Sequence, residues 1–271
     1  MNLLASIWGA ELGWIVATII PHYRHIAPDY DEVVIVGNPQ YAYLVEDFAH
    51  DFIPYSKKTL GDMWFRQRFP TKKAKLPKNI VSQFPDHQYL YPNKAVCMKG
   101  NRKYIQYGEE GKGYDIIIHA RAEDKYGQDK LNYSPLKYKK ILKNLRLDGD
   151  FSVCSIGTRA HHIEGTGDKR NIPMKELCTI LRNSKVCVGT SSGVSHLAHI
   201  CGCPIVVLTG NEYQKGIGGT NRKRYKKIWR VWENIPIKML DKDDWHPPKD
   251  VVEKAIRKFA YGRRTHENNT E

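Results

Sequence analysis

One stretch of the chain gathers small and hydroxyl-bearing residues with a histidine: Thr190, Ser191, Ser192, Gly193 and His196. Such a set could bind a phosphate group. Small residues let an anion approach the backbone, and the N–H groups at the start of a helix attract negative charge. The hydroxyls and the imidazole add further donors. The alternative is that one of the two serines only caps an ordinary helix, and the pattern alone leaves both interpretations open.

The residues on both sides of this stretch predict the elements that hold it. Val186–Val188 is a short β-branched run, which is typical of a buried strand. After the loop, apolar residues recur with the period of one helix face, at Val194, Leu197, Ala198 and Cys201. Gly202 and Pro204 end that helix, and the apolar run Ile205–Leu208 is typical of a parallel strand. We therefore expect a strand, a loop, a helix and a strand.

A carboxylate near the start of the chain could act as a general base. Residues 2–8 predict a buried first strand, and Glu11 lies in the turn that follows it, before a helix through Ile20. The carboxyl end of a strand in an open α/β sheet is where such folds bind ligands. The alternative is that Glu11 only favours the helix N-terminus electrostatically.

The central stretch resembles the donor-site signature of the heptosyltransferase-type glycosyltransferases. The matching residues are Gly193-Val194-Ser195-His196-Leu197-Ala198, then a Gly-x-Pro step, an apolar strand and Thr209-Gly210. The sequence departs from the signature at Ser191, where the family has Asp, and in its last turn. The resemblance implies an α/β, GT-B-like fold: two Rossmann-like domains with a cleft between them. It also implies inverting, metal-independent transfer from a nucleotide-sugar such as a UDP- or ADP-sugar.

The resemblance also assigns roles to individual residues. It implies that Glu11, in place of the family's usual Asp, is the catalytic base. It implies that Arg121 and Lys130 lie against the donor phosphates, and that Glu164 contacts the donor ribose. The donor-binding set is completed by Thr190, Ser191, Ser192, Gly193 and His196.

Alternating strand and helix patterns predict two α/β halves. A buried strand over 114–119 opens the second half, so we expect domains at 1–112 and 113–248. Residues 249–271 are expected to form a helix that crosses back to the first domain, followed by a tail. Further strands are predicted at 31–37, 51–55, 150–156 and 228–232, and further helices at 41–48, 135–145, 172–183 and 250–260. His22, Arg24 and His25 are interpreted as a solvated helix end, and the alternative is that they face an acceptor.

The composition is that of a packed globular protein of 271 residues, with 41% hydrophobic and 11% aromatic residues. No apolar run is long enough to span a bilayer, and the N-terminus lacks the basic leader of a signal peptide. The six cysteines are scattered without zinc-site spacing, which predicts buried free thiols in a reducing compartment. We therefore expect a cytoplasmic protein. Because His161, His162, Glu164 and Asp168 share one loop without a helix-spaced pair, no metal is expected.

The formal charge of +14 points to an acidic partner. Basic and aromatic residues interleave over 57–78, as in surfaces that hold a displaced base. The candidate acceptor-binding residues there are Trp64, Arg66, Arg68, Lys72 and Lys73. A second basic run, Asn221–Lys227, suits a phosphate backbone. Either run could instead be a solvated charged surface.

The charge and the basic and aromatic segment favour DNA as the acceptor, and a resemblance to proteins of large lytic phages, which glycosylate hydroxymethylated pyrimidines in their own DNA, implies that the acceptor is such a base. The Lys-, Tyr-, Asn- and Ile-rich composition resembles that of proteins from large lytic phages, which would place the enzyme in the host cytoplasm. Two alternatives stay open. One is transfer to lipopolysaccharide or another cell-surface glycan, and the other is a non-catalytic nucleic-acid-binding protein on the same scaffold.

Overall fold

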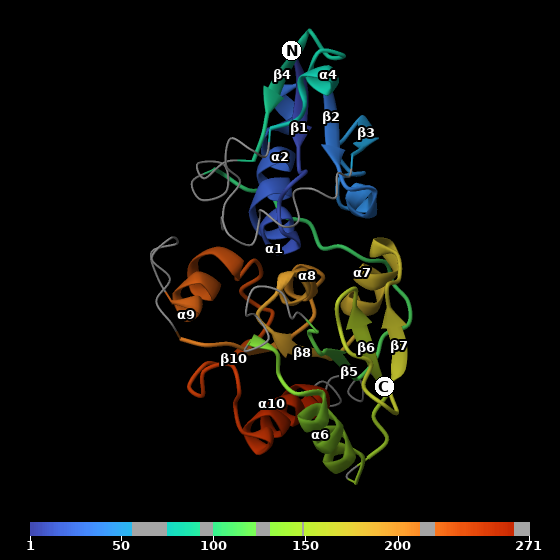
Figure 1. Cartoon of the computed structure of the whole chain (residues 1–271), viewed down its shortest axis with the longest axis vertical. Coiled ribbons are helices and arrows are strands. Elements are labelled where there is room, and N and C mark those ends of the chain that lie inside the picture. Colours follow the sequence, from blue (N-terminus) through green and yellow to red (C-terminus); the bar gives the residue numbers. More distant parts are fainter. Residues whose placement is uncertain (56–74, 93–99, 123–130, 148, 212–219, 263–271) are drawn as a thin grey trace, which may run out of the picture. The chain divides into compact units, whose positions relative to one another are not determined.

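Two parallel β-sheets organise the chain, and each belongs to its own unit in the computed structural model (Figure 1). The structure describes residues 1–55, 75–92, 100–122, 131–147, 149–211 and 220–262. The units are Met1–Ile105 and Gln106–Glu271, so they divide a few residues before the boundary expected from the sequence. Each sheet consists of parallel strands, and helices alternate with the strands along the chain, which makes the predicted α/β fold.

The first unit has a four-stranded parallel sheet in the order β3-β2-β1-β4. Its strands are β1 (Asn2–Ser6), β2 (Glu32–Gly37), β3 (Asp51–Pro54) and β4 (His87–Leu90). The apolar runs of β1 and β2 are buried, as the continuous β-branched pattern predicts. Strand β4 was not predicted, because it carries only one aliphatic residue.

A helical stretch connects β1 to β2. It runs through α1 (Leu12–Trp14), a π-helical segment η1 (Ile15–Ile19), α2 (Ile20–Ile26) and a 3₁₀ turn η2 (Ala27–Asp29). The region predicted as a helix over 41–48 is instead a 3₁₀ segment, η3 (Pro39–Leu44), and a short helix α4 (Lys78–Val81) precedes β4.

The interpretation of Arg24 as solvated is wrong. Its side chain is 3% exposed, and it donates to both carboxylate oxygens of Asp47, at 2.7 and 2.9 Å. It also donates to the carbonyl of Leu44 at 3.1 Å and lies over the ring of Phe48. Sequence spacing does not reveal such a pair, because Asp47 lies 23 residues further along the chain.

The second unit has a six-stranded parallel sheet in the order β10-β9-β8-β5-β6-β7. Its strands are β5 (Ile116–His119), β6 (Val153–Gly157), β7 (Gly167–Arg170), β8 (Val186–Thr190), β9 (Ile205–Leu208) and β10 (Ile237–Leu240). Strands β5, β6, β8 and β9 are fully buried, and all four were predicted from their apolar runs.

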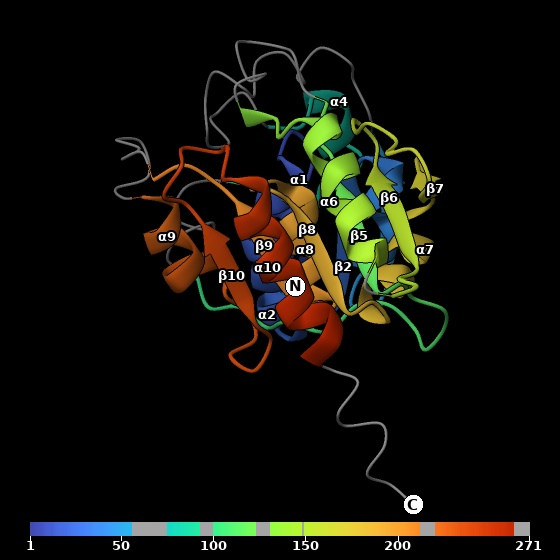
Figure 2. The same cartoon turned by 90° about the horizontal axis from the view of Figure 1, so that it is seen from below.

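Helices cover both faces of this sheet. Figures 1 and 2 show α6 (Pro135–Leu147) and α10 (Lys249–Gly262) side by side on one face, and α7 (Met174–Arg182) and α8 (Gly193–Ile200) on the other. Side chains of α6 and α10 share a core with β5, β6, β8, β9 and β10. Helix α10 thus forms part of the second unit's own outer layer, and its crossing to the first unit stays a prediction.

The strand predicted over 228–232 is wrong. That region follows a short helix α9 (Asn221–Arg224) as a π-helical segment η9 (Tyr225–Trp229), and the last strand is β10. The aromatic side chains of η9 pack on α8, so the segment is helical for a tertiary reason. Strand β7 was also missed, because its four residues, GDKR, are polar and it pairs only with β6 at the sheet edge.

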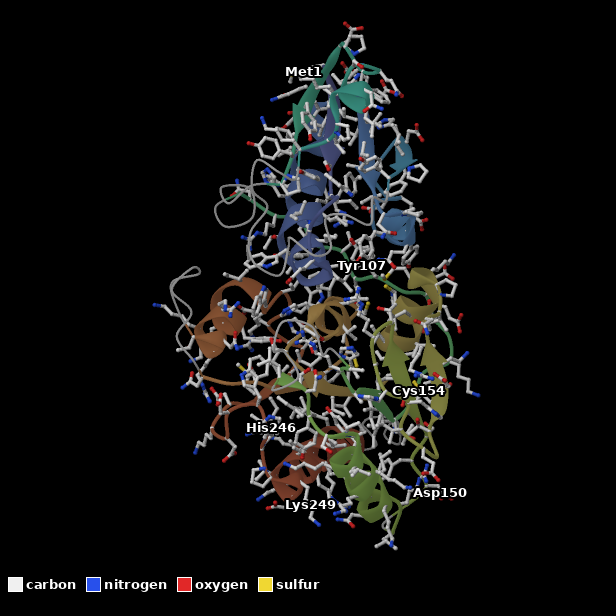
Figure 3. All side chains as sticks on the ribbon, in the orientation of Figure 1. Met1, Tyr107, Asp150, Cys154, His246 and Lys249 are labelled. Atoms are coloured by element: carbon white, nitrogen blue, oxygen red, sulfur yellow. The ribbon has the colours of Figure 1, made fainter. Side chains whose placement is uncertain are left out.

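The cysteines that the structure describes are buried free thiols, as predicted: Cys154, Cys178, Cys187, Cys201 and Cys203. Burial raises the pKa of the Cys154 thiol, which β6 carries (Figure 3), to about 12. The thiol therefore stays protonated and unreactive at neutral pH. Within the described ranges, no helix is long and apolar enough to cross a bilayer.

Candidate functional site

The order of strands in the second sheet reverses between β5 and β8. From β5 the chain moves outward to β6 and β7, and it then returns to the other side of β5 to form β8, β9 and β10. Ligands of open α/β sheets bind at the carboxyl ends of the strands at such a switch point. Here those ends carry His119 on β5 and Thr190 on β8, and the loop of Ser191 and Ser192 follows.

His119 connects the two strands at this point. Its Nδ1 lies 3.2 Å from the hydroxyl oxygen of Ser192. Two glycines make room for it: a Cβ at Gly157 would come within 2.6 Å of the imidazole, and one at Gly189 within 2.9 Å of the His119 carbonyl oxygen. Burial, together with the charge of Arg121, lowers the pKa of His119 to about 4. The imidazole is therefore neutral at neutral pH.

The Ser191 hydroxyl is also oriented by a side chain from elsewhere in the chain, and neighbouring hydroxyls lie around it. The Ser191 hydroxyl lies 3.1 Å from the phenol oxygen of Tyr225, and Ser195 donates to the carbonyl of Thr190 at 3.0 Å. Ser192 holds the extended N-cap position of α8, but its side chain makes no capping hydrogen bond. The Thr190 hydroxyl is buried and has no hydrogen-bond partner among the described residues. The serines therefore do more than cap a helix.

The first sheet has its own switch point between β1 and β4, and Glu11 lies in the loop that leaves it. Glu11 is exposed and holds the N-cap position of α1. Its backbone carbonyl accepts from the N–H groups of Trp14 and Ile15, while its side chain makes no capping bond. Burial raises the pKa of Tyr41, and the negative charge of Glu11 adds to that shift. Glu11 thus follows the carboxyl end of β1, the edge at which open α/β sheets generally bind ligands, and its role as a base stays a prediction.

Comparisons with known proteins find matches among solved structures. Escherichia coli heptosyltransferase WaaC with ADP aligns with a TM-score of 0.58 at 11% identity, over 95% of this chain and 99% of that one. The E. coli ADP-heptose lps heptosyltransferase II aligns with a TM-score of 0.60 at 12% identity, over 97% of this chain and 100% of that one. A glycosyl transferase family 9 protein from Veillonella parvula aligns with a TM-score of 0.56 at 11% identity, over 96% of each chain. The chain has the heptosyltransferase fold. No protein-family model and no curated protein matches the sequence.

In this heptosyltransferase fold, His196 lies inside an aromatic cluster. Its ring centroid is 4.2 Å from that of Trp229 and 5.3 Å from that of Tyr225, and Arg224 lies over Trp229 at 4.7 Å. Burial is the main cause that lowers the pKa of His196 to about 3, and the nearby Arg224 adds to it. The ring therefore joins α8 to η9 as a neutral group, and its donation to a ligand stays a prediction.

The structure places the other predicted donor-site residues in different surroundings. Arg121 lies two residues after the end of β5 and forms an isolated β-bridge with Ala160, so it lies at the carboxyl edge of the sheet. Glu164 is exposed in the loop between β6 and β7 and forms an ion pair with Lys139 of α6, which lowers the pKa of its carboxyl. The roles of both residues toward a donor stay predictions.

Several predicted site residues lie outside the described part of the chain: Lys130 of the donor set, and Trp64, Arg66, Arg68, Lys72 and Lys73 of the acceptor set. Within the described part, no three His, Cys, Asp or Glu side chains are grouped to hold a metal ion.

The basic run that begins at Asn221 has both buried and exposed side chains. Arg224 and Asn221 are buried, while Arg222 is half-exposed and donates to both oxygens of Asp241. Lys223 and Lys226 point into solvent. The run is therefore partly structural and does not form one continuous solvated face.

Sequence reasoning missed His119 and Tyr225. A signal for His119 was present, since it ends the apolar run of 114–119 and so falls at the carboxyl end of a buried strand. Tyr225 had no such signal, because it lies within a basic run and meets Ser191 only through the tertiary fold.

Proposed function

We propose that this chain transfers a sugar from a nucleotide-sugar to an acceptor hydroxyl. The observation that carries the proposal is the set of oriented hydroxyls at the switch point of the second sheet, at the start of α8. It supports the binding of a diphosphate, because hydroxyls and helix N–H groups together offer donors to an anion. The solved structures of the same fold include one with ADP, which supports a nucleotide diphosphate as the leaving group.

In this proposal His119 and Tyr225 orient the two serine hydroxyls. A neutral His119 can donate from Nδ1 to the oxygen of Ser192, which leaves the Ser192 proton for a phosphate oxygen. Tyr225 can do the same for Ser191. Ser191 stands where the resembled family carries Asp, so the site lacks a negative charge that would repel phosphate. Both ADP- and UDP-sugars fit this description.

The proposed chemistry is a single inverting displacement. The acceptor oxygen attacks the anomeric carbon, the bond from that carbon to the diphosphate breaks, and the acceptor proton passes to the carboxylate of Glu11. The diphosphate leaves with the electron pair, and the donors at the start of α8 stabilise its charge. Glu11 is exposed at the ligand-binding edge of the first sheet, as a base that meets an external acceptor must be.

Two acceptors are proposed for this reaction. A hydroxymethylated pyrimidine in DNA is supported by the charge of +14 and by the basic and aromatic segment 57–78. A lipopolysaccharide saccharide is supported by the fold shared with the lps heptosyltransferase II. A chain that only binds nucleic acid is the non-catalytic alternative.

Donor binding is tested with the Ser192→Ala variant. Because a hydrogen bond to a charged group contributes about 1.5–3 kcal/mol, we expect the affinity for ADP or UDP to fall at least tenfold, measured by calorimetry. Ser152→Ala is the matched control, since the Ser152 hydroxyl also makes a side-chain bond, to Asp115, but at the amino end of β6. Equal nucleotide affinity in wild type and Ser192→Ala would refute the diphosphate site.

Catalysis and acceptor are tested together by mass spectrometry after incubation with nucleotide-sugars. Duplex DNA with 5-hydroxymethylcytosine or 5-hydroxymethyluracil is one acceptor, and lipopolysaccharide core is the other. A nucleoside or a saccharide heavier by one sugar identifies the acceptor. Nucleotide binding without transfer to either one supports the non-catalytic alternative.

The base is tested with Glu11→Gln, which we expect to lower transfer about 100-fold or more while nucleotide binding persists. Glu46→Gln is the matched control, because Glu46 is an exposed carboxylate of the same unit. Transfer by Glu11→Gln at the wild-type rate would exclude Glu11 as the base.

A further inference from the structure

The outer side of α6 combines leucines and lysines in one stripe. Leu136, Lys140, Lys143 and Leu147 follow at i, i+4, i+7 and i+11, the spacing of residues on a single helix face. Leu136 is 70% exposed and Leu147 is 78% exposed. The opposite side of the helix carries Tyr138, Ile141, Leu142 and Leu145, which are buried against the sheet. The two leucines therefore have no part in the core.

Helix α10 extends this surface. It packs beside α6 and begins at Lys249, which Figure 3 labels. Val251, Lys254 and Lys258 lie on its exposed side at i, i+3 and i+7. Among the described residues, four large hydrophobic side chains are exposed, and three of them belong to these two helices: Leu136, Leu147 and Val251. We call Leu136, Lys140, Lys143, Leu147, Val251, Lys254 and Lys258 the α6–α10 face.

The charge of this face is strongly positive. Helix α6 contains no acidic residue. Glu253 of α10 is half-buried, and it accepts hydrogen bonds from Arg257 and from Asn144 instead of pairing with the lysines. The four lysines of the face form no ion pair with any described residue. Asp250 is the one exposed acidic side chain on the two helices. The lysines are thus available to an external anion.

We propose that the α6–α10 face docks on the surface of a bilayer that contains anionic lipids. Helices that lie in a membrane interface place apolar side chains among the acyl chains and lysines at the headgroups, which is the combination found here. Each lysine near an anionic surface contributes about a fivefold gain in affinity. Duplex DNA would pair with the lysines as well, but phosphate contacts leave the leucines at both ends of the stripe without a role.

The docking is tested with the full chain by co-sedimentation with vesicles of phosphatidylcholine, with and without one quarter phosphatidylglycerol. We expect binding only to the anionic vesicles. Lys140→Gln/Lys143→Gln should weaken it about 25-fold, since two lysine contacts are lost. Lys112→Gln/Lys238→Gln is the matched control, because it removes the same charge from exposed positions outside the face.

A third double variant separates a membrane from a nucleic acid. Leu136→Ser/Leu147→Ser should weaken vesicle binding about tenfold or more, because it removes the inserting side chains, and should leave binding to duplex DNA unchanged. Because the leucines are exposed, the variant should melt at the wild-type temperature. Absence of binding to anionic vesicles would overturn the proposal. Vesicle binding by the leucine variant at the wild-type level would also overturn it. A third refuting result would be that the wild type binds duplex DNA tightly but does not bind vesicles, and that only the lysine variant loses the DNA binding.

Discussion

Acidification should destabilise the second unit through its buried histidines. The pKa values of His119 and His199 are lowered to about 4, and that of His196 to about 3, in each case mainly by burial. Neighbouring arginines add to the shifts, as Arg224 does at His196. His199 Nε2 also accepts from the backbone N–H of Trp232, a bond that protonation would break.

The direction follows from where the protons bind. In the unfolded chain these histidines become protonated as the pH falls below about 6.5, whereas in the folded unit they stay neutral down to about 4 or below. The unfolded state therefore binds more protons across this window, and the stability that is present at neutral pH is lost as the pH falls. A pH of 5 lies about one and a half units below the pKa of a histidine in the unfolded chain. Each buried neutral histidine therefore lowers the free energy of unfolding by about 2 kcal/mol at that pH. Three such groups give about 6 kcal/mol, a large share of the 5–15 kcal/mol typical of a domain.

The assay is amide hydrogen exchange along α8 at pH 7.5 and pH 5, corrected for the intrinsic rate, in the wild type and in His196→Gln. We expect the opening free energy of α8 to fall at pH 5 in both proteins. The fall should be about 2 kcal/mol smaller in the variant, because the glutamine at position 196 cannot be protonated. The comparison uses the pH-dependent difference, so a general loss of stability in the variant does not affect it. An equal acid-induced loss in both proteins would refute the reasoning.

Two further predictions concern packing. Gly189→Ala should destabilise the second unit by about 1–3 kcal/mol and weaken nucleotide binding, because its Cβ would meet backbone of His119. Gly167→Ala, where the new Cβ meets nothing closer than 3.5 Å, is the control, and equal melting temperatures for both variants would contradict the prediction. Arg24→Ala should destabilise the first unit by about 2–4 kcal/mol, because it leaves Asp47 without its partner and a void beside it. A urea midpoint equal to that of the wild type would count against this.

The sequence was most informative where local signals agree. Residues 186–208 combine a β-branched run, a helical period and a Gly–Pro stop, and the structure has a strand, a helix and a strand there, within two residues of the expected bounds. The predictions failed where tertiary contacts decide the conformation. The range 228–232 was predicted as a strand, yet Trp229 lies on a helical turn four positions after Tyr225, because both rings pack on His196.

The candidate site shows the same division. The hydroxyls of the loop could be found from residue types alone, as could the exposed carboxylate of Glu11 after the first strand. The groups that orient the hydroxyls could not, because His119 and Tyr225 lie 73 and 34 residues from the serines they contact. Arg24 is a similar case, since a basic residue in a polar stretch gives no sign of a buried partner.

The position of α10 has a consequence for synthesis of the chain. The strands of each sheet come from one continuous stretch, so the first unit can form while the second is still being made. The second unit differs, because the face of β8 and β9 that α10 covers stays open until residue 262 has been added. Until then, a row of apolar side chains in the middle of the sheet is exposed to solvent. A chain stopped before α10 should therefore aggregate, and a ribosome that pauses there would expose the same surface to chaperones.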